Sequence, residues 1–384
     1  MTDASPLPRG AETKRVRILV LMDSVSVSGP VRQLGAVIRP LAAMGFDLHC
    51  VIFQRLGKAP NLSSEFLRSM GATVTTLTDS RAFDPGLIWR LEALIDECRP
   101  DVIETHGYRP SVLLAMLRLT KRIDRAWIGY FHGRTAESLS VKLYDKLDHL
   151  CLRFADLVVV MSELQRREKA GYSAEVRVLY NAAIEESSTA ATSADLAQLL
   201  AAYEQPFVGV VGRLSPEKGV DVLLSAWRSL VRAGHGGTLL VAGDGPERLR
   251  YEAYVLREGI AGRVVFLGHL NGTRNLYPLI KILVIPSRSE GLPNVFIEAL
   301  RAGIQVVSTS VGALPELVGD THAANLVPID DVGALSTAVA AALSPEIPPR
   351  WASDARLLLD RLSLSSRVTA ITETYKDVMR RVAT

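Results

Sequence analysis

The feature that most constrains how this chain can fold is a series of short, almost continuously apolar runs separated by segments of helical length. Seven runs lie in the first half, at Val16–Met22, Asp47–Phe53, Thr73–Leu77, Asp101–Thr105, Ala126–Phe131, Asp156–Met161 and Val176–Tyr180. Five lie in the second half, at Phe207–Gly212, Thr238–Gly243, Arg263–Gly268, Lys281–Ser287 and Ile304–Ser310. Parallel strands have this composition when helices cover both faces of their sheet. The pattern therefore predicts two α/β domains of the doubly wound type.

The segments between these runs have helical length and end in turn signals. Examples are Pro30–Met44, Leu87–Cys98, Val220–Ala233 and Val295–Ala302, and a last helix is expected at Ser363–Val382. A Ser-, Thr- and Ala-rich stretch at Glu185–Gln198 separates the halves and is interpreted as a connection with a peripheral helix. The expected organisation is a disordered tail at 1–15, a first domain at 16–185, a linker with a peripheral helix at 186–204, a second domain at 205–362 and a helix at 363–384.

Composition narrows the class of protein. Apolar residues make up 48% and charged residues 22% of the 384 positions, which is typical of a globular chain with a large core. No apolar run reaches the roughly 18 residues that cross a bilayer, and the N-terminus lacks the apolar segment of a secretory signal. Three widely spaced cysteines in apolar segments favour buried thiols in a reducing compartment, so we expect a cytoplasmic location.

The charge distribution bears on partners. A net charge of +3 is too small to predict a nucleic-acid partner, and none is expected. Residues 1–185 carry 25 Lys and Arg against 21 Asp and Glu, and the remaining residues carry 19 against 20. Basic clusters at Leu119–Arg125 and Leu164–Ala170 permit peripheral contact with an anionic membrane surface. A solvated protein surface explains the same bias equally well.

Two cations follow the first strand of the second half, where the chain turns into a helix. Arg213 and Lys218 stand in the loop after Gly212, and Gly219 allows a tight turn before the helical segment. The free N–H groups at a helix N-terminus favour anions, and the two cations add to this potential. In doubly wound sheets, ligands bind outside the carboxyl ends of the strands. The loop is therefore a candidate phosphate site, although two solvated surface cations would have the same sequence.

Two glutamates, Glu290 and Glu298, flank a short stretch that contains Pro293. Because proline is well accommodated in the first turn of a helix, we expect a helix to begin at about Pro293–Val295. Glu290 then lies in the loop and Glu298 in the helix, with free amide groups between them. Carboxylates accept hydrogen bonds from sugar hydroxyls strongly, so this spacing is compatible with a sugar and ribose site. Glu298 alone would more often be a residue that complements the helix dipole.

Glycine and histidine occur at other predicted strand ends. Gly243 allows close backbone approach, but the chain lacks the G-x-G-x-x-G fingerprint, which disfavours a nicotinamide dehydrogenase. His106 and His132 each end a predicted strand and precede a glycine, so both are candidate site residues. A structural role is nevertheless the more common one for a lone histidine. No Asp-x-Asp motif occurs in the chain, and no metal site is expected.

Five segments together resemble the group-1 family of retaining, nucleotide-sugar glycosyltransferases. They read SGPVRQLGAVIRPLAAMGFDLHCV, GRLSPEKG, AGDGPE, FLGHL and PSRSEGLPNVFIEALRAGIQVVSTSVGALPELV, and the resemblance extends from about Arg17 to Tyr375. It implies the GT-B fold, in which two doubly wound, Rossmann-like α/β domains face each other across a cleft. The first domain would bind the acceptor and the second the nucleotide-sugar donor, with the C-terminal helix crossing back to the first domain.

The resemblance also implies roles for individual residues. The catalytic set would be His132, Arg213, Lys218 and Glu290, with the two cations on the donor diphosphate and the other two beside the transferred sugar. The donor-binding set would be Gly29, Gly212, Gly243, Gly291, Leu292, Pro293, Asn294, Val295 and Glu298, of which the last would bind ribose hydroxyls. The acceptor side would carry His106, Arg109 and Arg134.

The implied reaction moves a hexose-type sugar from a nucleotide-diphosphate sugar, expected to be a UDP-sugar, to a hydroxyl of a saccharide or lipid-linked acceptor. The nucleotide-sugar is a substrate, and neither a cofactor nor a metal is expected. Cations and helix N-termini would stabilise the leaving diphosphate in place of a metal. The family resemblance further implies envelope or exopolysaccharide biosynthesis, with peripheral contact at the inner face of the cell membrane.

Two positions depart from the family's pattern. Pro30 stands where a second glycine is usual, and it has no N–H for a phosphate oxygen. Ala182 follows Asn181 where a glycine is usual, which weakens the comparison at the hinge. Two alternatives to the glycosyltransferase remain: a nucleotide-sugar epimerase with the same architecture, and a non-catalytic homologue that serves as an interaction subunit. The latter would be expected to lack Lys218 or Glu290, and both are present.

Overall fold

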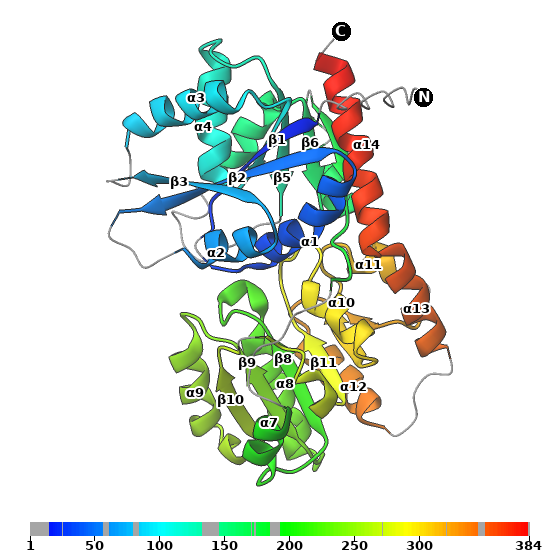
Figure 1. Cartoon of the computed structure of the whole chain (residues 1–384). Coiled ribbons are helices and arrows are strands. Elements are labelled where there is room, and N and C mark those ends of the chain that lie inside the picture. Colours follow the sequence, from blue (N-terminus) through cyan, green and yellow to red (C-terminus); the bar gives the residue numbers. More distant parts are fainter. Residues whose placement is uncertain are drawn as a thin grey trace, which may run out of the picture.

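Figure 1 shows a computed structural model of the chain, in which two α/β domains lie one above the other. The structure describes residues 15–24, 26–56, 61–79, 84–132, 146–169, 171–172, 174–184, 193–270, 272–319, 321–344 and 350–382. The predicted tail at 1–15 falls almost entirely outside the described residues, whereas residues 193–204 of the predicted linker at 186–204 are described and include a helix.

Parallel strands with helices on both faces form the first domain. In the described residues the sheet has seven strands in the order β3-β2-β1-β4-β5-β6-β7. They are β1 (Val16–Met22), β2 (Phe46–Arg55), β3 (Thr73–Asp79), β4 (Val102–His106), β5 (Ala126–Phe131), β6 (Leu157–Val160) and β7 (Glu175–Val178). The helical elements are α1 (Gly29–Ala43), α2 (Leu62–Ser69), α3 (Gly86–Cys98), α4 (Tyr108–Leu119), η1 (Leu152–Phe154) and α6 (Glu163–Glu168). Every residue of β4 and β5 is buried, which explains the apolar character of β5, whereas β4 buries polar side chains as well.

The second domain repeats this arrangement. Its six described strands are all parallel, in the order β10-β9-β8-β11-β12-β13. They are β8 (Phe207–Val211), β9 (Thr238–Ala242), β10 (Val264–Gly268), β11 (Ile282–Ile285), β12 (Gln305–Thr309) and β13 (Asn325–Val327). The helical elements are α7 (Ser193–Leu200), η2 (Pro216–Lys218), α8 (Val220–Arg232), α9 (Arg248–Arg257), η3 (Ala261–Arg263), η4 (Tyr277–Leu279), α10 (Asn294–Arg301), α11 (Leu314–Val318), α12 (Val332–Leu343) and α13 (Trp351–Arg361).

The predicted fold class is confirmed: two doubly wound domains are present, and each of the twelve predicted strands corresponds to an observed one. The sequence analysis missed β13, because only one of its three residues is buried. It also named no helix at α12 or α13.

The C-terminal helix α14 (Leu364–Val382) packs against α1 and β5 of the first domain. It runs along that domain as the red helix of Figure 1. Its buried apolar residues Val368, Ile371, Tyr375 and Val378 recur at helical spacing and enter the core beside Phe46. Arg177 of β7 donates hydrogen bonds to two further side chains of α14, Thr374 at 3.2 Å and Asp377 at 3.1 Å. The end of the chain thus completes the first domain.

Hydrogen bonds join the two domains near the start of α10. Gln33 of α1 donates to the side-chain oxygen of Asn294 at 3.1 Å and to the carbonyl of Ala182 at 2.9 Å, and it accepts from the Ala182 N–H at 2.9 Å. Asn181 donates to the Leu292 carbonyl at 3.1 Å. The segment that departs from the family's pattern at Ala182 therefore lies directly between the domains.

Candidate active site

Lys218 and Glu290, which the sequence analysis singled out separately, form an ion pair at the carboxyl edge of the second sheet. The Lys218 Nζ donates to Glu290 Oε1 at 2.6 Å, and Ser287 Oγ donates to the same oxygen at 2.8 Å. The side chains are 30% and 13% exposed, so the pair is partly shielded from water but open to a ligand. Because an ammonium group has three donors, Lys218 can bind a phosphate oxygen while it keeps Glu290.

Close backbone packing fixes the loop that carries Lys218. Gly219 follows with φ of 65°, and a Cβ at this position would lie 2.0 Å from the carbonyl oxygen of Pro286. Only glycine fits this left-handed conformation and this contact. Pro286 directly precedes the loop of Glu290. The contact therefore fixes the loop of Lys218 relative to the loop of Glu290.

Arg288 ties the same two loops together, and the sequence analysis missed it. Its guanidinium donates to both carboxylate oxygens of Asp221, at 2.9 and 2.8 Å, and to Asp330 at 2.6 Å. It also donates to the Pro216 carbonyl at 2.6 Å, while its backbone N–H donates to the Glu217 carbonyl at 2.8 Å. Burial alone would raise the pKa of Asp221, but hydrogen bonds and charge from Arg288 lower it below its ordinary value. Sequence gives no sign of this pairing, because its partners lie 67 and 42 positions away.

Glu298, expected to bind ribose hydroxyls, already accepts two hydroxyl groups of the chain. Tyr277 donates to Glu298 Oε2 at 2.6 Å, and Thr273 donates to the same oxygen at 3.0 Å. Burial and the carboxylate charge raise the pKa of Tyr277 well above its ordinary value, which keeps the phenol a donor. A carboxylate has about four acceptor positions, so these two bonds orient Glu298 without saturating it.

Glycines let the backbones of this region approach closely. A Cβ on Gly243 would lie 1.8 Å from the carbonyl oxygen of Gly212, so the predicted donor-binding glycines lie side by side after β8 and β9. Arg213, the next residue, is exposed. The helix α10 begins at Asn294, directly after Pro293, and in the described part of the chain its N-cap residue supplies no side-chain cap to the first N–H groups. These groups therefore remain donors for a ligand.

The first domain meets this region at two points. A Cβ on Gly29, the first residue of α1, would lie 2.4 Å from the side-chain nitrogen of Asn294. A Cβ on Gly291 would lie 2.7 Å from the carbonyl oxygen of His132 and 3.0 Å from Met161. The loop of Glu290 thus reaches the strand end that carries His132, and residues predicted from opposite halves of the chain lie together.

His132 is hydrogen bonded to His106 rather than standing alone. His106 Nδ1 and His132 Nε2 are 2.9 Å apart, and His106 Nε2 lies 3.4 Å from Glu104 Oε2. Burial, with smaller contributions from the charges of His106 and Arg367, lowers the pKa of His132 well below its ordinary value of 6.5. The imidazole is therefore neutral near pH 7. Sequence alone gave each histidine as a separate candidate and did not indicate this contact.

The remaining acceptor-side candidates are placed differently. Arg109 pairs with Asp79 at 3.2 Å and with Asp23 at 3.5 Å, so its charge is balanced within the first domain. Burial raises the pKa of Asp23 despite the opposing effect of Arg109. Arg134 lies outside the described residues.

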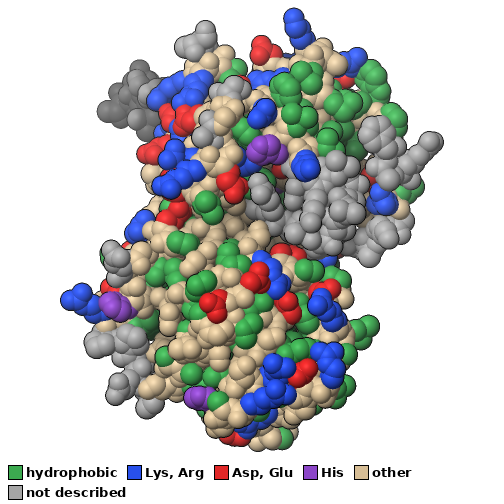
Figure 2. All heavy atoms as spheres, turned by 180° about the vertical axis from the view of Figure 1, so that it is seen from behind, with side chains coloured by type: hydrophobic (Ala, Val, Ile, Leu, Met, Phe, Trp, Pro, Cys, Tyr) green, Lys and Arg blue, Asp and Glu red, His purple; other side chains and the backbone are tan. Residues whose placement is uncertain are grey.

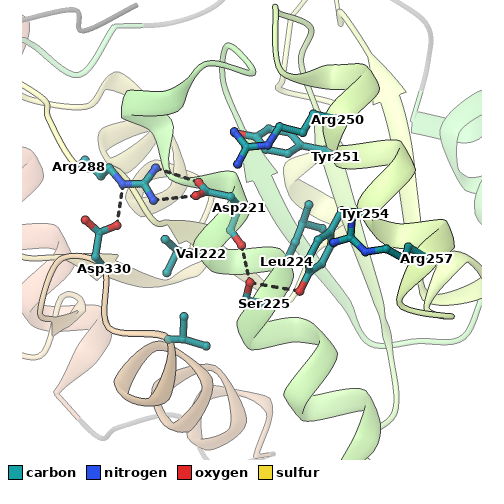
Figure 3. Close-up of a pocket in the computed structure, with 11 residues that line it drawn as sticks. Asp221, Val222, Leu224, Ser225, Arg250, Tyr251, Tyr254, Arg257, Arg288 and Asp330 are labelled. Carbon is teal, nitrogen blue, oxygen red and sulfur yellow. Dashed lines mark hydrogen bonds and ion pairs between the residues drawn. The ribbon is translucent and has the colours of Figure 1, made fainter.

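A hollow of about 570 Å³ lies elsewhere on the second domain, between α8 and α9 (Figure 3). Its walls include Arg250, Arg257 and Arg288, each of which is paired with an acidic residue. None of the predicted site residues lines it. The pair of Arg288 and Asp221 links it to the candidate site.

Two kinds of feature are absent from the described residues. No group of three or more His, Cys, Asp or Glu side chains in them could hold a metal ion. None of the helices among them is long and apolar enough to cross a membrane.

Comparisons with known proteins agree on one family. A model of "Glycosyl transferases group 1" matches residues 205–344, and a model of "Glycosyltransferase Family 4" matches residues 27–184. The chain is 34% identical over 145 residues to a 2-deoxystreptamine glucosyltransferase of Streptomyces kanamyceticus, covering 37% of this chain and 38% of that protein. It is 29% identical over 238 residues to an alpha-D-kanosaminyltransferase of the same organism, covering 59% and 62%. The matches thus span between about a third and two thirds of these curated relatives.

Among solved structures, the fold resembles that of the Anabaena protein HepE in complex with UDP and glucose. The TM-score is 0.78 at 20% sequence identity, over 94% of this chain and 100% of HepE. At this identity the likeness supports the shared fold of two facing domains.

Proposed function

The chain belongs to the group 1 glycosyltransferases, and from that premise we propose that it transfers a hexose-type sugar from a nucleotide-diphosphate sugar to a hydroxyl group, with retention of configuration. The observation that carries the proposal is the 2.6 Å pair of Lys218 and Glu290, at a strand end where a doubly wound sheet binds its ligand. A non-catalytic homologue would have no need to keep this pair.

In this proposal the cations act on the leaving group. The bond between the anomeric carbon and the β-phosphate oxygen breaks, and its electron pair stays on the departing diphosphate. Lys218 and Arg213, with the uncapped N–H groups of α10, stabilise the charge that develops there. The acceptor oxygen bonds to the anomeric carbon from the face that the diphosphate leaves, and its proton passes to the departing phosphate oxygen.

The other site residues hold the donor. Glu290 accepts hydrogen bonds from hydroxyls of the transferred sugar, and His132 faces the same sugar from the first domain. The backbone at Gly291 to Val295 supplies N–H donors, and Glu298 uses its remaining acceptor positions for the ribose hydroxyls. Gly243 leaves room for the base. Contact between Gly291 and His132 supports a sugar position between the domains.

For the donor base we propose uracil, and for the acceptor a saccharide or a lipid-linked hydroxyl of envelope polysaccharide synthesis. HepE, which shares the fold, was crystallised with UDP and glucose. The relatives from Streptomyces carry names of sugar transferases. We further propose that arginine, lysine and the helix N-termini make the reaction independent of a metal ion.

Peripheral contact with a membrane is part of the proposal. Met116 and Leu119 on α4 and Phe154 on η1 are exposed, and α4 packs against η1. Arg118 donates to the Phe154 carbonyl at 3.0 Å, and the basic cluster at Leu119–Arg125 follows. Figure 2 shows hydrophobic side chains gathered beside Lys and Arg side chains on the first domain. Binding to vesicles that contain anionic lipid, weakened by salt, is the expected result; equal binding to neutral vesicles at any salt would contradict it.

Calorimetric titration with a panel of nucleotide-sugars and nucleoside diphosphates tests the donor site. We expect a UDP-sugar to bind to the wild type and to Lys376→Ala, an exposed lysine of α14 away from the site, and to bind more weakly to Lys218→Ala. Failure of every nucleotide-sugar to bind would favour the non-catalytic alternative. The anomeric configuration of the product, read by NMR, tests retention: an inverted linkage would overturn that part of the mechanism.

A further inference from the structure

Three polar side chains, Glu104, His106 and His132, contact one another in series behind the candidate site. Glu104 and His106 belong to β4, and His132 follows β5, its neighbour in the sheet. Glu104 is 2% exposed and His106 is 7% exposed. The His106 ring also stacks on Tyr130, with ring centroids 4.3 Å apart and planes 14° from parallel. Both ring nitrogens of His106 are therefore committed to neighbours in a rigid part of the sheet.

Glu104, the buried end of this series of contacts, determines which nitrogen donates and which accepts at each hydrogen bond. A carboxylate only accepts hydrogen bonds, so the nitrogen of His106 that faces Glu104, Nε2, must carry a proton. When His106 is the neutral imidazole, its other nitrogen, Nδ1, accepts, and its partner at 2.9 Å, Nε2 of His132, donates. Nδ1 of His132 consequently keeps its lone pair. No hydrogen bond to this nitrogen is formed within the described part of the chain.

We propose that Glu104 and His106 are positioning residues that hold His132 as its Nε2–H tautomer, with Nδ1 left as a hydrogen-bond acceptor for a hydroxyl group of the bound sugar. The contact between Nδ1 and a sugar hydroxyl rests on the proposed function. The Nε2–H tautomer of His132 does not, because it belongs to the free protein.

A cation from the other end of the sequence interacts electrostatically with the buried side chain of Glu104. Arg367 of α14 is 8% exposed; burial lowers its pKa, while electrostatic interactions with Tyr130 and Glu104 oppose that effect. The other groups that face the carboxylate are the phenols of Tyr130 and Tyr375, whose pKa values burial and Glu104 raise, and the thiol of Cys50 on β2, whose pKa burial raises to about 12. All three are neutral at pH 7, so Arg367 is the cation that balances Glu104 there.

This arrangement gives α14 a role in the site besides packing. The helix follows the second domain in sequence, yet it buries Arg367 in the first domain, where this side chain interacts electrostatically with Glu104. The tautomer of His132 therefore depends on α14, a helix that follows the second domain in sequence and packs on the first.

The proton position can be measured directly by NMR of the full chain labelled with 15N at histidine, without substrate. We expect a proton attached to Nε2 of His132 and a scalar coupling across the N–H···N bond to Nδ1 of His106. The exposed His322 serves as an internal reference. A proton found on Nδ1 of His106, or the absence of any coupling between the rings, would overturn the proposal.

Kinetics supply a second readout. His106→Phe keeps a ring to stack on Tyr130 but removes both hydrogen bonds, and Glu104→Gln removes the charge. Both are expected to lower kcat about 10- to 100-fold, the range seen when residues that orient a ligating histidine are changed, with KM for the donor nearly unchanged. The control Glu92→Gln removes a surface partner of Arg122 and should leave kcat unaltered. Wild-type kcat in both variants would contradict the proposal. If the NMR result holds but no sugar is transferred, the proposed function fails by itself.

Discussion

Adding one methyl group at Gly291 should separate the two domains at the candidate site. The new Cβ in Gly291→Ala would lie 2.7 Å from the carbonyl oxygen of His132, whereas ordinary contacts begin at 3.4 Å. The shortfall is 3.4 − 2.7 = 0.7 Å, and the neighbouring atom belongs to the backbone of a strand end. The side chain of Met161, at 3.0 Å from the new Cβ, prevents the Cβ from moving away from the His132 oxygen in that direction. The loop of Glu290 and the end of β5 must therefore move apart.

The size of the effect follows from this displacement. Overpacking a tight contact costs about 1–3 kcal/mol, and misplacing reacting groups by about 1 Å can cost roughly 100-fold in rate. For a displacement of 0.7 Å we expect kcat/KM to fall about 10- to 100-fold, equivalent to about 1.4–2.7 kcal/mol. The loss should appear mainly in kcat, because the contacts of the donor with the second domain remain in place.

The assay is steady-state release of nucleoside diphosphate from the preferred nucleotide-sugar, with thermal unfolding to verify the fold. Gly262→Ala is the matched control, since a Cβ there meets no atom within 4 Å. Wild-type kcat/KM in both variants would show that the domains do not need this close approach, and it would refute the reasoning.

Three further predictions concern Arg288, Ile371 and His132. Arg288→Lys cannot make the two parallel hydrogen bonds to Asp221, so kcat should fall about tenfold through misplacement of Lys218, whereas an unchanged kcat would show that the loops hold their positions without it. Ile371→Ala in α14 removes a buried side chain and should lower the free energy of unfolding by about 2–5 kcal/mol in chemical denaturation; a loss below about 1 kcal/mol would mean that α14 does not complete the core. Burial lowers the pKa of His132 below its ordinary value of 6.5. At a pH below 6.5 the unfolded chain therefore binds a proton at this residue more readily than the native protein does. The free energy of unfolding should consequently decrease as the pH falls through 6.5. The fall in Tm between pH 7 and 5 should thus be smaller in His132→Gln than in the wild type, and equal falls would contradict a buried neutral His132.

The fold could be predicted because its information is local. Runs such as Ala126–Phe131 are apolar throughout since both faces of the sheet are covered, and the observed β5 has the same bounds. The strand β13 lacks that signal, because two of its three residues are partly or fully exposed. The position of α14 against the first domain came from the family resemblance and not from the helix pattern, which does not reveal what a helix packs against.

The candidate site was predictable only in part. Motif positions gave Lys218 and Glu290 as residues of one region, but their hydrogen bond spans 72 positions and needed the structure. Arg288 looked like an ordinary loop residue, since its carboxylate partners come from the first turn of α8 and from the loop before α12. His106 was expected on the acceptor side, and that role stays a prediction; its contact with His132 joins two strands that are neighbours only after folding.

The most direct test of the account is the rate of nucleoside diphosphate release from UDP-sugars by the wild type, Lys218→Ala and Lys376→Ala. We expect the wild type and Lys376→Ala to release nucleoside diphosphate at the same rate. Lys218→Ala should be slower by about 100- to 1,000-fold, or about 2.7–4 kcal/mol, which is the usual loss when one group that stabilises developing negative charge is removed. Release by Lys218→Ala at the wild-type rate would contradict the central claim that this lysine and Glu290 form the catalytic site.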